Sequence, residues 1–111
     1  MEENNEIISI EIDLGTIRKN IVNEGFFDMF GNDVRMVLGA MIGGSSVPMN
    51  ITGTRSEISA FTAALKYEKQ YIKIAAKYGL DDPRTYRNKY KLKKAIVKFE
   101  RATGLRWPLE G

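Results

Sequence analysis

The 111-residue sequence contains no cysteine and no histidine. The absence of cysteine excludes disulfides, thiolate metal sites and cysteine nucleophiles. The absence of histidine removes the commonest general base, the Ser-His and Cys-His dyads and the commonest zinc ligand. An enzyme built from this chain would depend on Asp, Glu, Lys or Tyr, and the sequence shows no convergent carboxylates. We therefore expect a protein that is not an enzyme and that uses no metal ion and no cofactor.

Long apolar runs are also missing. The longest ones, such as residues 37–42, are far too short to cross a bilayer. The first six residues are acidic and polar, which differs from the basic start of a signal peptide, and no apolar segment of the required length follows them. These absences predict no membrane association and a cytoplasmic location.

What the sequence does contain is an uneven distribution of charge. Residues 1–53 hold eight acidic and three basic residues, whereas residues 54–111 hold fourteen basic and six acidic residues. The overall net charge of +3 hides this difference. A basic half favours a nucleic-acid or acidic-protein partner. The same difference is also compatible with internal neutralisation between the halves, or with a dimer that joins unlike halves.

The acidic half has the pattern of two strands and two helices. Residues 8–14 alternate between apolar and polar side chains, as a half-buried strand does. Gly15 is expected to break this strand, and Thr16 to cap a short helix that ends at Gly25. A second helix is expected to begin at Asn32 or Asp33. After a glycine- and serine-rich loop, residues 47–52 form the second predicted strand.

The basic half is expected to form two long helices. The first begins with Thr54 as N-cap and Glu57 three residues later, a capping box, and ends at Gly79. The second begins at Asp82 and Pro83 and ends at Gly104. Residues 107–108 then follow as a predicted anchor that folds back on the core.

The predicted architecture is therefore a single α+β domain over residues 1–111, in the order β-α-α-β-α-α. A small sheet of two or three strands packs against a long C-terminal helical hairpin. Because two strands alone make a marginal sheet, three solutions stay open: a hidden third strand, helices that cover the ribbon, or a homodimer that pairs sheet edges.

Two rows of basic residues follow the predicted helices of the hairpin. The spacing of three and four residues places each row on one side of its helix. The row on the last helix consists of Arg84, Arg87, Lys91, Lys94, Lys98 and Arg101. The row on the preceding helix consists of Lys66, Lys69, Lys73 and Lys77. Such lines of long cations suit phosphate backbones, so these ten residues are the predicted nucleic-acid-binding site.

An ordinary solvated face is the alternative interpretation of these rows, because an amphipathic helix needs a polar side. The scarcity of acids among them argues for a counter-charge elsewhere, which the acidic half is one candidate to supply. The sequence does not decide whether the rows merge into one patch. Tyr86 and Tyr90 lie close to the row of the last helix and would stack on bases if they are exposed.

Residues 25–31 (GFFDMFG) concentrate large apolar side chains around one aspartate. They favour a place in the core, but if Phe26, Phe27 or Phe30 is exposed, the segment becomes a docking patch for a partner protein. The start of the predicted helix after Gly53 resembles an anion site only weakly, and helix capping explains it equally well. Capping likewise explains the adjacent Asp81 and Asp82.

A set of residues in about the last sixty positions of the sequence carries a resemblance to a known group of proteins. These are Ile51-Thr52-Gly53, Ser56, Phe61, Ala64-Leu65, Glu68, Tyr71, Gly79 to Thr85, Phe99-Glu100, Thr103-Gly104 and Trp107-Pro108. Over these positions, roughly half of its length, the chain resembles small uncharacterised proteins encoded by T4-like tailed phages of marine bacteria. The resemblance implies an intracellular phage product in the host cytoplasm, and it implies no activity and no site residues.

Two functions of different classes follow from these patterns. The first is a non-enzymatic accessory protein that binds nucleic acid through the basic face of the last helix. The second is a protein-interaction module, such as a modulator of a host factor or a minor assembly factor, that uses the Phe26–Phe30 segment or a sheet edge.

Overall fold

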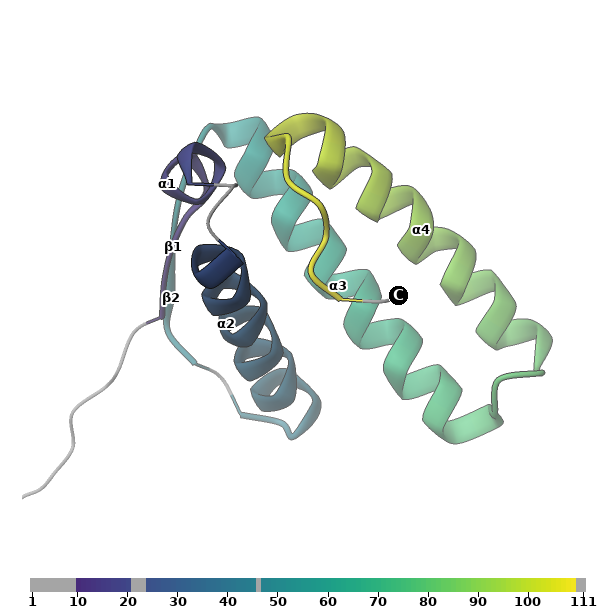
Figure 1. The fold of residues 1–111 in the computed structure, drawn as a ribbon. Helices are drawn as coiled ribbons and strands as arrows, with labels where there is room; N and C mark the ends of the chain where they lie inside the picture. Colours follow the sequence, from purple (N-terminus) through teal and green to yellow (C-terminus); the bar gives the residue numbers. More distant parts are fainter. Residues whose placement is uncertain (1–9, 21–23, 46, 110–111) are drawn as a thin grey trace, which may run out of the picture.

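The structure is a computed structural model, and it describes residues 10–20, 24–45 and 47–109. Its elements are β1 (Ile10–Asp13), α1 (Leu14–Lys19), α2 (Glu24–Ile42), β2 (Met49–Thr52), α3 (Arg55–Tyr78) and α4 (Pro83–Thr103). This order confirms the predicted β-α-α-β-α-α arrangement. In Figure 1 the strands and α1 lie at one side, α2 lies in the middle, and α3 and α4 form a hairpin at the other side.

The two strands β1 and β2 pair in parallel, with Ile10 opposite Met49 and Ile12 opposite Ile51. Within β1 the burial alternates, so Ile10 and Ile12 face the core while Glu11 and Asp13 face solvent. A parallel pair needs a crossover connection, which α1 and α2 provide. In the described part of the chain the sheet has two strands, and the helices cover its apolar face. The homodimer through sheet edges stays a prediction.

The start of α1 differs from the sequence prediction. Helix α1 begins at Leu14, and its N-cap is Asp13, whose side chain accepts a hydrogen bond from Thr16 N–H at 3.1 Å. The predictions that Gly15 ends the strand and that Thr16 caps the helix are therefore wrong. Leu14 is fully buried as the first helical residue, which explains why it continued the apolar pattern of the strand.

The start of α2 also differs from the prediction. The helix is already present at Glu24 and runs through the whole GFFDMFG segment, so Asn32 and Asp33 lie inside it and cap nothing. The expected helix end at Gly25 is also wrong. A glycine inside a helix costs roughly 1 kcal/mol relative to alanine. The burial of Phe30, Val34, Val37 and Leu38 along one side of α2 outweighs that cost, since each buried large side chain contributes about 1.5–3 kcal/mol.

The hairpin of α3 and α4 follows the predicted signals closely. Thr54 and Glu57 form the capping box: Thr54 N–H donates to Glu57 Oε1 at 2.8 Å, and Glu57 N–H donates to Thr54 Oγ1 at 3.1 Å. Asp82 caps α4, Pro83 occupies its first turn, and Gly104 ends it in the left-handed conformation at φ 74°. The two helices pack along most of their length, which confirms the C-terminal helical hairpin (Figure 1).

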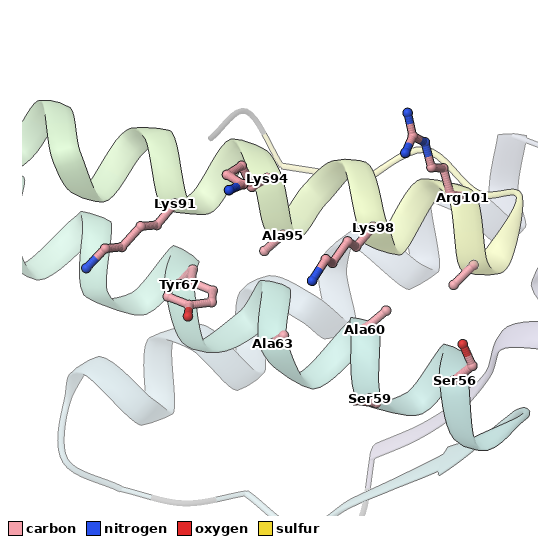
Figure 2. Close-up of a pocket in the computed structure, with 11 residues that line it drawn as sticks. Ser56, Ser59, Ala60, Ala63, Tyr67, Lys91, Lys94, Ala95, Lys98 and Arg101 are labelled. Carbon is pink, nitrogen blue, oxygen red and sulfur yellow. The ribbon is translucent and has the colours of Figure 1, made fainter.

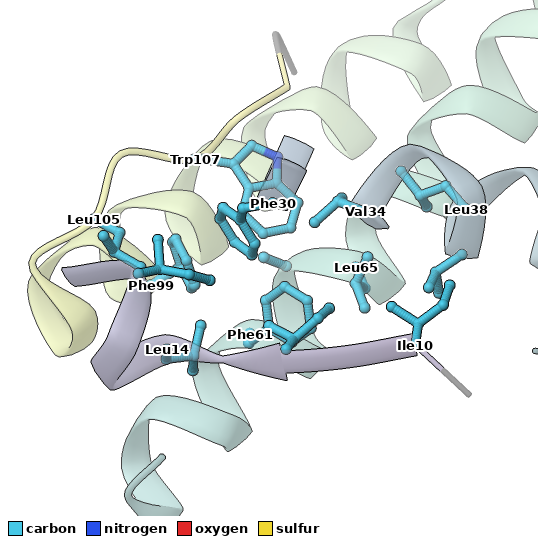
Figure 3. Close-up of a cluster of buried hydrophobic side chains, with 14 of the residues drawn as sticks. Ile10, Leu14, Phe30, Val34, Leu38, Phe61, Leu65, Phe99, Leu105 and Trp107 are labelled. Carbon is cyan, nitrogen blue, oxygen red and sulfur yellow. The ribbon is translucent and has the colours of Figure 1, made fainter. Parts of the chain in front are cut away.

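A cluster of aromatic rings forms the centre of the single core. Phe30 of α2, Phe61 of α3 and Phe99 of α4 lie with ring centroids 5.9–6.3 Å apart. The C-terminal segment folds back over them as predicted, and Trp107 contacts Phe99 edge to face at 5.1 Å (Figure 3). The Trp107 indole N–H donates to the buried carboxylate of Glu68 at 2.9 Å. All six elements contribute to this core, and the described residues form one compact domain.

Candidate functional site

The hairpin carries a groove of about 780 Å³ between the first half of α3 and the second half of α4. Figure 2 looks into this groove, and α2 lies behind the hairpin in that view, so the groove opens on the side away from the core. Its lining comes from these two helices alone. The residues are Ser56, Ser59, Ala60, Ala63 and Tyr67 of α3 and Lys91, Lys94, Ala95, Lys98, Arg101 and Ala102 of α4.

Small side chains on α3 form the floor of the groove. Ser59 and Ala60 follow Ser56 by three and four residues, and Ala63 follows them by four and three, so all four share one side of the helix. Because none of them extends far from the backbone, they leave unfilled space beside α4. Tyr67 follows one turn later and lies near Lys91 and Lys94 (Figure 2). The residues of this floor were not among the predicted site residues, although the repeated small side chains were a signal that could have revealed it.

Four cations of α4 form the other wall. Lys91, Lys94, Lys98 and Arg101 are all exposed, and no acidic residue lines the groove. In the described part of the chain none of the four makes a salt bridge. Lys91 and Lys98 extend their amines across the groove towards α3, whereas Arg101 points away from it (Figure 2). The wall therefore offers unpaired positive charge to an anionic ligand.

Arg84 stands apart from the other basic residues of α4. Its guanidinium donates to both carboxylate oxygens of Asp82, at 2.9 and 3.0 Å, and lies 3.5 Å from the centre of the Tyr78 ring. The hydrogen bonds from Arg84 lower the pKa of Asp82 to about 2. Arg84 thus holds the start of α4 in place. Among the residues that the structure describes, the predicted row of six is therefore reduced to five cations without an ion pair, with Arg87 as its first member.

A second hollow of about 520 Å³ lies further towards the start of α4. Tyr86, Arg87, Tyr90, Lys91 and Lys94 line it. Both tyrosines are exposed, with 58% and 63% of their surface accessible. Lys91 and Lys94 also line the groove, so the two hollows form one continuous surface along α4. We call this surface, from Tyr86 to Arg101, the cationic track.

The basic row of α3 lies outside the cationic track. The described lining of the two hollows contains none of its members, Lys66, Lys69, Lys73 and Lys77. On a helical projection this row is displaced by about a quarter turn from the small residues of the groove floor. Two of its members lie over neighbouring tyrosine rings, Lys66 at 5.7 Å from Tyr67 and Lys77 at 5.2 Å from Tyr78. The two rows therefore do not merge in the groove.

Internal neutralisation by the acidic half is not seen in the described residues. In the ion pair that joins the halves there, the acidic half supplies the cation, Arg18 of α1, and the basic half supplies the anion, Glu57 of α3. Arg18 also donates to the Thr103 carbonyl at 2.9 Å and so ties α1 to the end of α4. The hydrogen bonds from Thr54 and Arg18 hold the pKa of Glu57 below its usual value. This carboxylate also occupies the start of α3, where the sequence suggested a weak anion site.

The aromatic segment of α2 is divided between the core and the surface, and Met29 within it is exposed. Phe30 is 1% exposed and packs on Phe61 and Phe99, so it is not available as a docking residue. Phe26 and Phe27 are half-buried, and the Phe27 ring lies 5.2 Å from the Arg106 guanidinium. The core interpretation of this segment is therefore confirmed for Phe30.

We also searched the described residues for a metal site and for a membrane-spanning helix. No three acidic side chains there come close enough together to hold a metal ion. No helix of residues 10–20, 24–45 and 47–109 has the length and apolar character needed to cross a membrane.

No family model, curated protein or solved structure matches the chain. The site thus defines a small α+β protein with an open cationic track on its terminal hairpin.

Proposed function

We propose that this protein is a non-enzymatic accessory protein that binds nucleic acid through the phosphate backbone. The observation that carries the proposal is the cationic track, where five exposed cations along α4 have no acidic partner among the described residues. A row of unpaired cations next to a groove suits a polyanion, because bound counterions are released when the phosphates replace them. The contact needs no unique base and therefore predicts little sequence preference.

The helix geometry matches an extended ligand. From Arg87 to Arg101 the track is about 21 Å long at 1.5 Å per residue. The small floor of α3 lets a sugar-phosphate chain approach the lysine amines of α4 from the open side. The hydroxyls of Ser56, Ser59 and Tyr67 add hydrogen-bonding groups to the same groove. Phage origin and a place in the host cytoplasm belong to this proposal as the setting that the sequence resemblance implies.

The alternative is a protein-interaction module, and it has less support. Its predicted contact residues were Phe26, Phe27 and Phe30, and Phe30 is enclosed by the core. A sheet edge remains as its second predicted contact. Capture of the same protein partner from lysate before and after nuclease treatment would favour this alternative, whereas partners that vanish with nuclease favour nucleic acid.

Two charge-matched variants test the proposal. The first reverses Lys91, Lys94 and Lys98 to Glu on α4, and the second reverses Lys66, Lys73 and Lys77 to Glu on α3. Both change the net charge by the same amount, and all six side chains are exposed, so both variants should fold. Binding of labelled oligonucleotides at low salt is measured by fluorescence anisotropy, with circular dichroism as the folding control.

The α4 variant should lose about 100-fold or more in affinity, which corresponds to about 2.7 kcal/mol. The α3 variant should lose only a few-fold, because its lysines act only through the long-range field. Equal losses in both variants would show that net charge alone, and not the cationic track, governs binding. No binding by the unmodified protein at low salt would overturn the proposal.

A further inference from the structure

Tyr86 and Tyr90 are the largest exposed side chains of the cationic track, and other tyrosines of the hairpin differ from them. Tyr67 and Tyr71 are half-buried, and the Tyr78 ring is covered by the Arg84 guanidinium. In the described residues, Tyr86 makes no ring contact, and Tyr90 has only the amine of Lys94 5.4 Å from its ring. Packing therefore does not explain why two aromatic rings occupy this polar side of α4.

Their spacing places the two rings on one side of the helix. Residues four apart are separated by about 6 Å along a helix axis, and they lie on the same face. Arg87 and Lys91 line the hollow together with both rings. This combination of aromatic rings and cations is the one that single-strand binding proteins use, because bases stack on the rings while the cations contact the backbone.

A duplex does not suit this hollow as well. In a double helix the flat faces of the bases are already stacked on one another, so a tyrosine ring reaches them only by unstacking a step, which costs a few kcal/mol. A single strand presents its base faces at no such cost. The hollow leads through Lys91 and Lys94 into the groove, where the small floor leaves room for the continuing backbone.

We infer that the cationic track selects single-stranded nucleic acid, with bases stacked on Tyr86 and Tyr90 and phosphates held by Arg87, Lys91, Lys94 and Lys98. This inference rests on the proposed function and adds the class of nucleic acid that is bound. The length of the track corresponds to a site of about four to six nucleotides, at the small end of the range for single-strand binding folds.

The experiment compares three proteins with three ligands. The proteins are the unmodified chain, Y86A/Y90A and Y86F/Y90F, and the last of these keeps both rings as a matched control. The ligands are an oligothymidylate of about 15 nucleotides, the corresponding oligouridylate, and a duplex of the same length. Both rings are exposed, so the substitutions should leave the fold intact, which circular dichroism checks.

The unmodified protein should bind both single strands more tightly than the duplex. Y86A/Y90A should weaken single-strand binding by about 30-fold or more, since two stacked bases are lost and each contributes about 1–3 kcal/mol, and should leave duplex binding nearly unchanged. Y86F/Y90F should retain single-strand affinity. If the duplex binds as tightly as the single strands and Y86A/Y90A binds all ligands normally, the inference fails while the proposed function stands. If no ligand binds, both fail.

Discussion

The two faces of the α3–α4 hairpin are built from the same two helices and have opposite character. The closed face, which is turned towards α2 and the C-terminal segment, buries Phe61 and Phe99, and both of their rings contact Trp107. The open face carries small residues of α3 and the unpaired cations of α4. Figure 3 shows the first face filled with side chains, and Figure 2 shows the second face with space between them.

The difference shows what each face contributes. On the closed face large apolar side chains pack against α2 and the C-terminal segment. Their burial supplies the main stabilisation of the fold. On the open face the exposed lysines have no ion-pair partners in the described chain, so they contribute little to stability. Stability and binding should therefore respond to substitutions on different faces.

The largest effect on stability is expected from Phe99→Ala on the closed face. Phe99 is fully buried and contacts the rings of Phe30, Phe61 and Trp107, so its removal leaves a large cavity. We expect a loss of about 3–5 kcal/mol in the free energy of unfolding, measured by urea denaturation. Val97→Ala on the exposed side of α4 is the control and should change stability by about 0.5 kcal/mol or less. Similar losses in the free energy of unfolding of the two variants would contradict the claim that the closed face supplies the main stabilisation.

A smaller effect is expected from Glu57→Gln, at the edge between the two faces. The variant keeps an oxygen for Thr54 N–H but loses the ion pair with Arg18, which is partly exposed, so we expect a loss of about 1 kcal/mol at neutral pH.

The pH dependence of this loss follows from the lowered pKa of Glu57. The stabilisation by a carboxylate with a lowered pKa is present above its unfolded pKa and disappears as the pH falls through the folded pKa. The difference between the two proteins should therefore be constant near neutral pH and shrink below about pH 4.5 in denaturation series. A difference that grows in acid would contradict the assigned role.

The smallest effect is expected from Glu68→Gln, within the closed face. Burial raises the pKa of Glu68, although the Trp107 indole N–H opposes this shift. A carboxyl with a raised pKa favours the folded state at low pH and loses that contribution as the pH rises through the folded pKa. The variant should thus be as stable as the parent at neutral pH or up to about 1 kcal/mol more stable, and this advantage should vanish towards pH 4.5. A large loss at neutral pH would show that Trp107 requires the charged partner.

The sequence predicted the hairpin well because its signals are local. Thr54 with Glu57, Asp82 with Pro83, and Gly104 each act within one helical turn, and each caps its helix as expected. The first half was predicted less well because long-range burial decides it. Phe30 lies in a helix that is already present at Glu24, and its ring packs against Phe61 of α3 and Phe99 of α4, two contacts that local signals around Gly25 do not encode.

The candidate site divides in the same way. The spacing of the lysines on α4 predicted that Lys91, Lys94 and Lys98 share one side of the helix, and this is confirmed. The spacing gave no information about the side of α3 that faces them, because that depends on how the two helices pack. The hydrogen bonds from Arg84 to Asp82 and the exposure of both tyrosines likewise depend on side-chain conformations. The periodicity of the sequence does not encode these conformations.

The salt dependence of single-strand binding tests the central claim most directly. Each phosphate contact adds about −0.7 to the slope of log affinity against log salt concentration, so five free cations predict a slope between about −2 and −3.5 for the unmodified protein. Reversal of Lys91, Lys94 and Lys98 leaves Arg87 and Arg101, so that slope should become shallower than about −1.4. A slope near zero for the unmodified protein, or the same slope in both proteins, would contradict the claim that the open face binds a phosphate backbone.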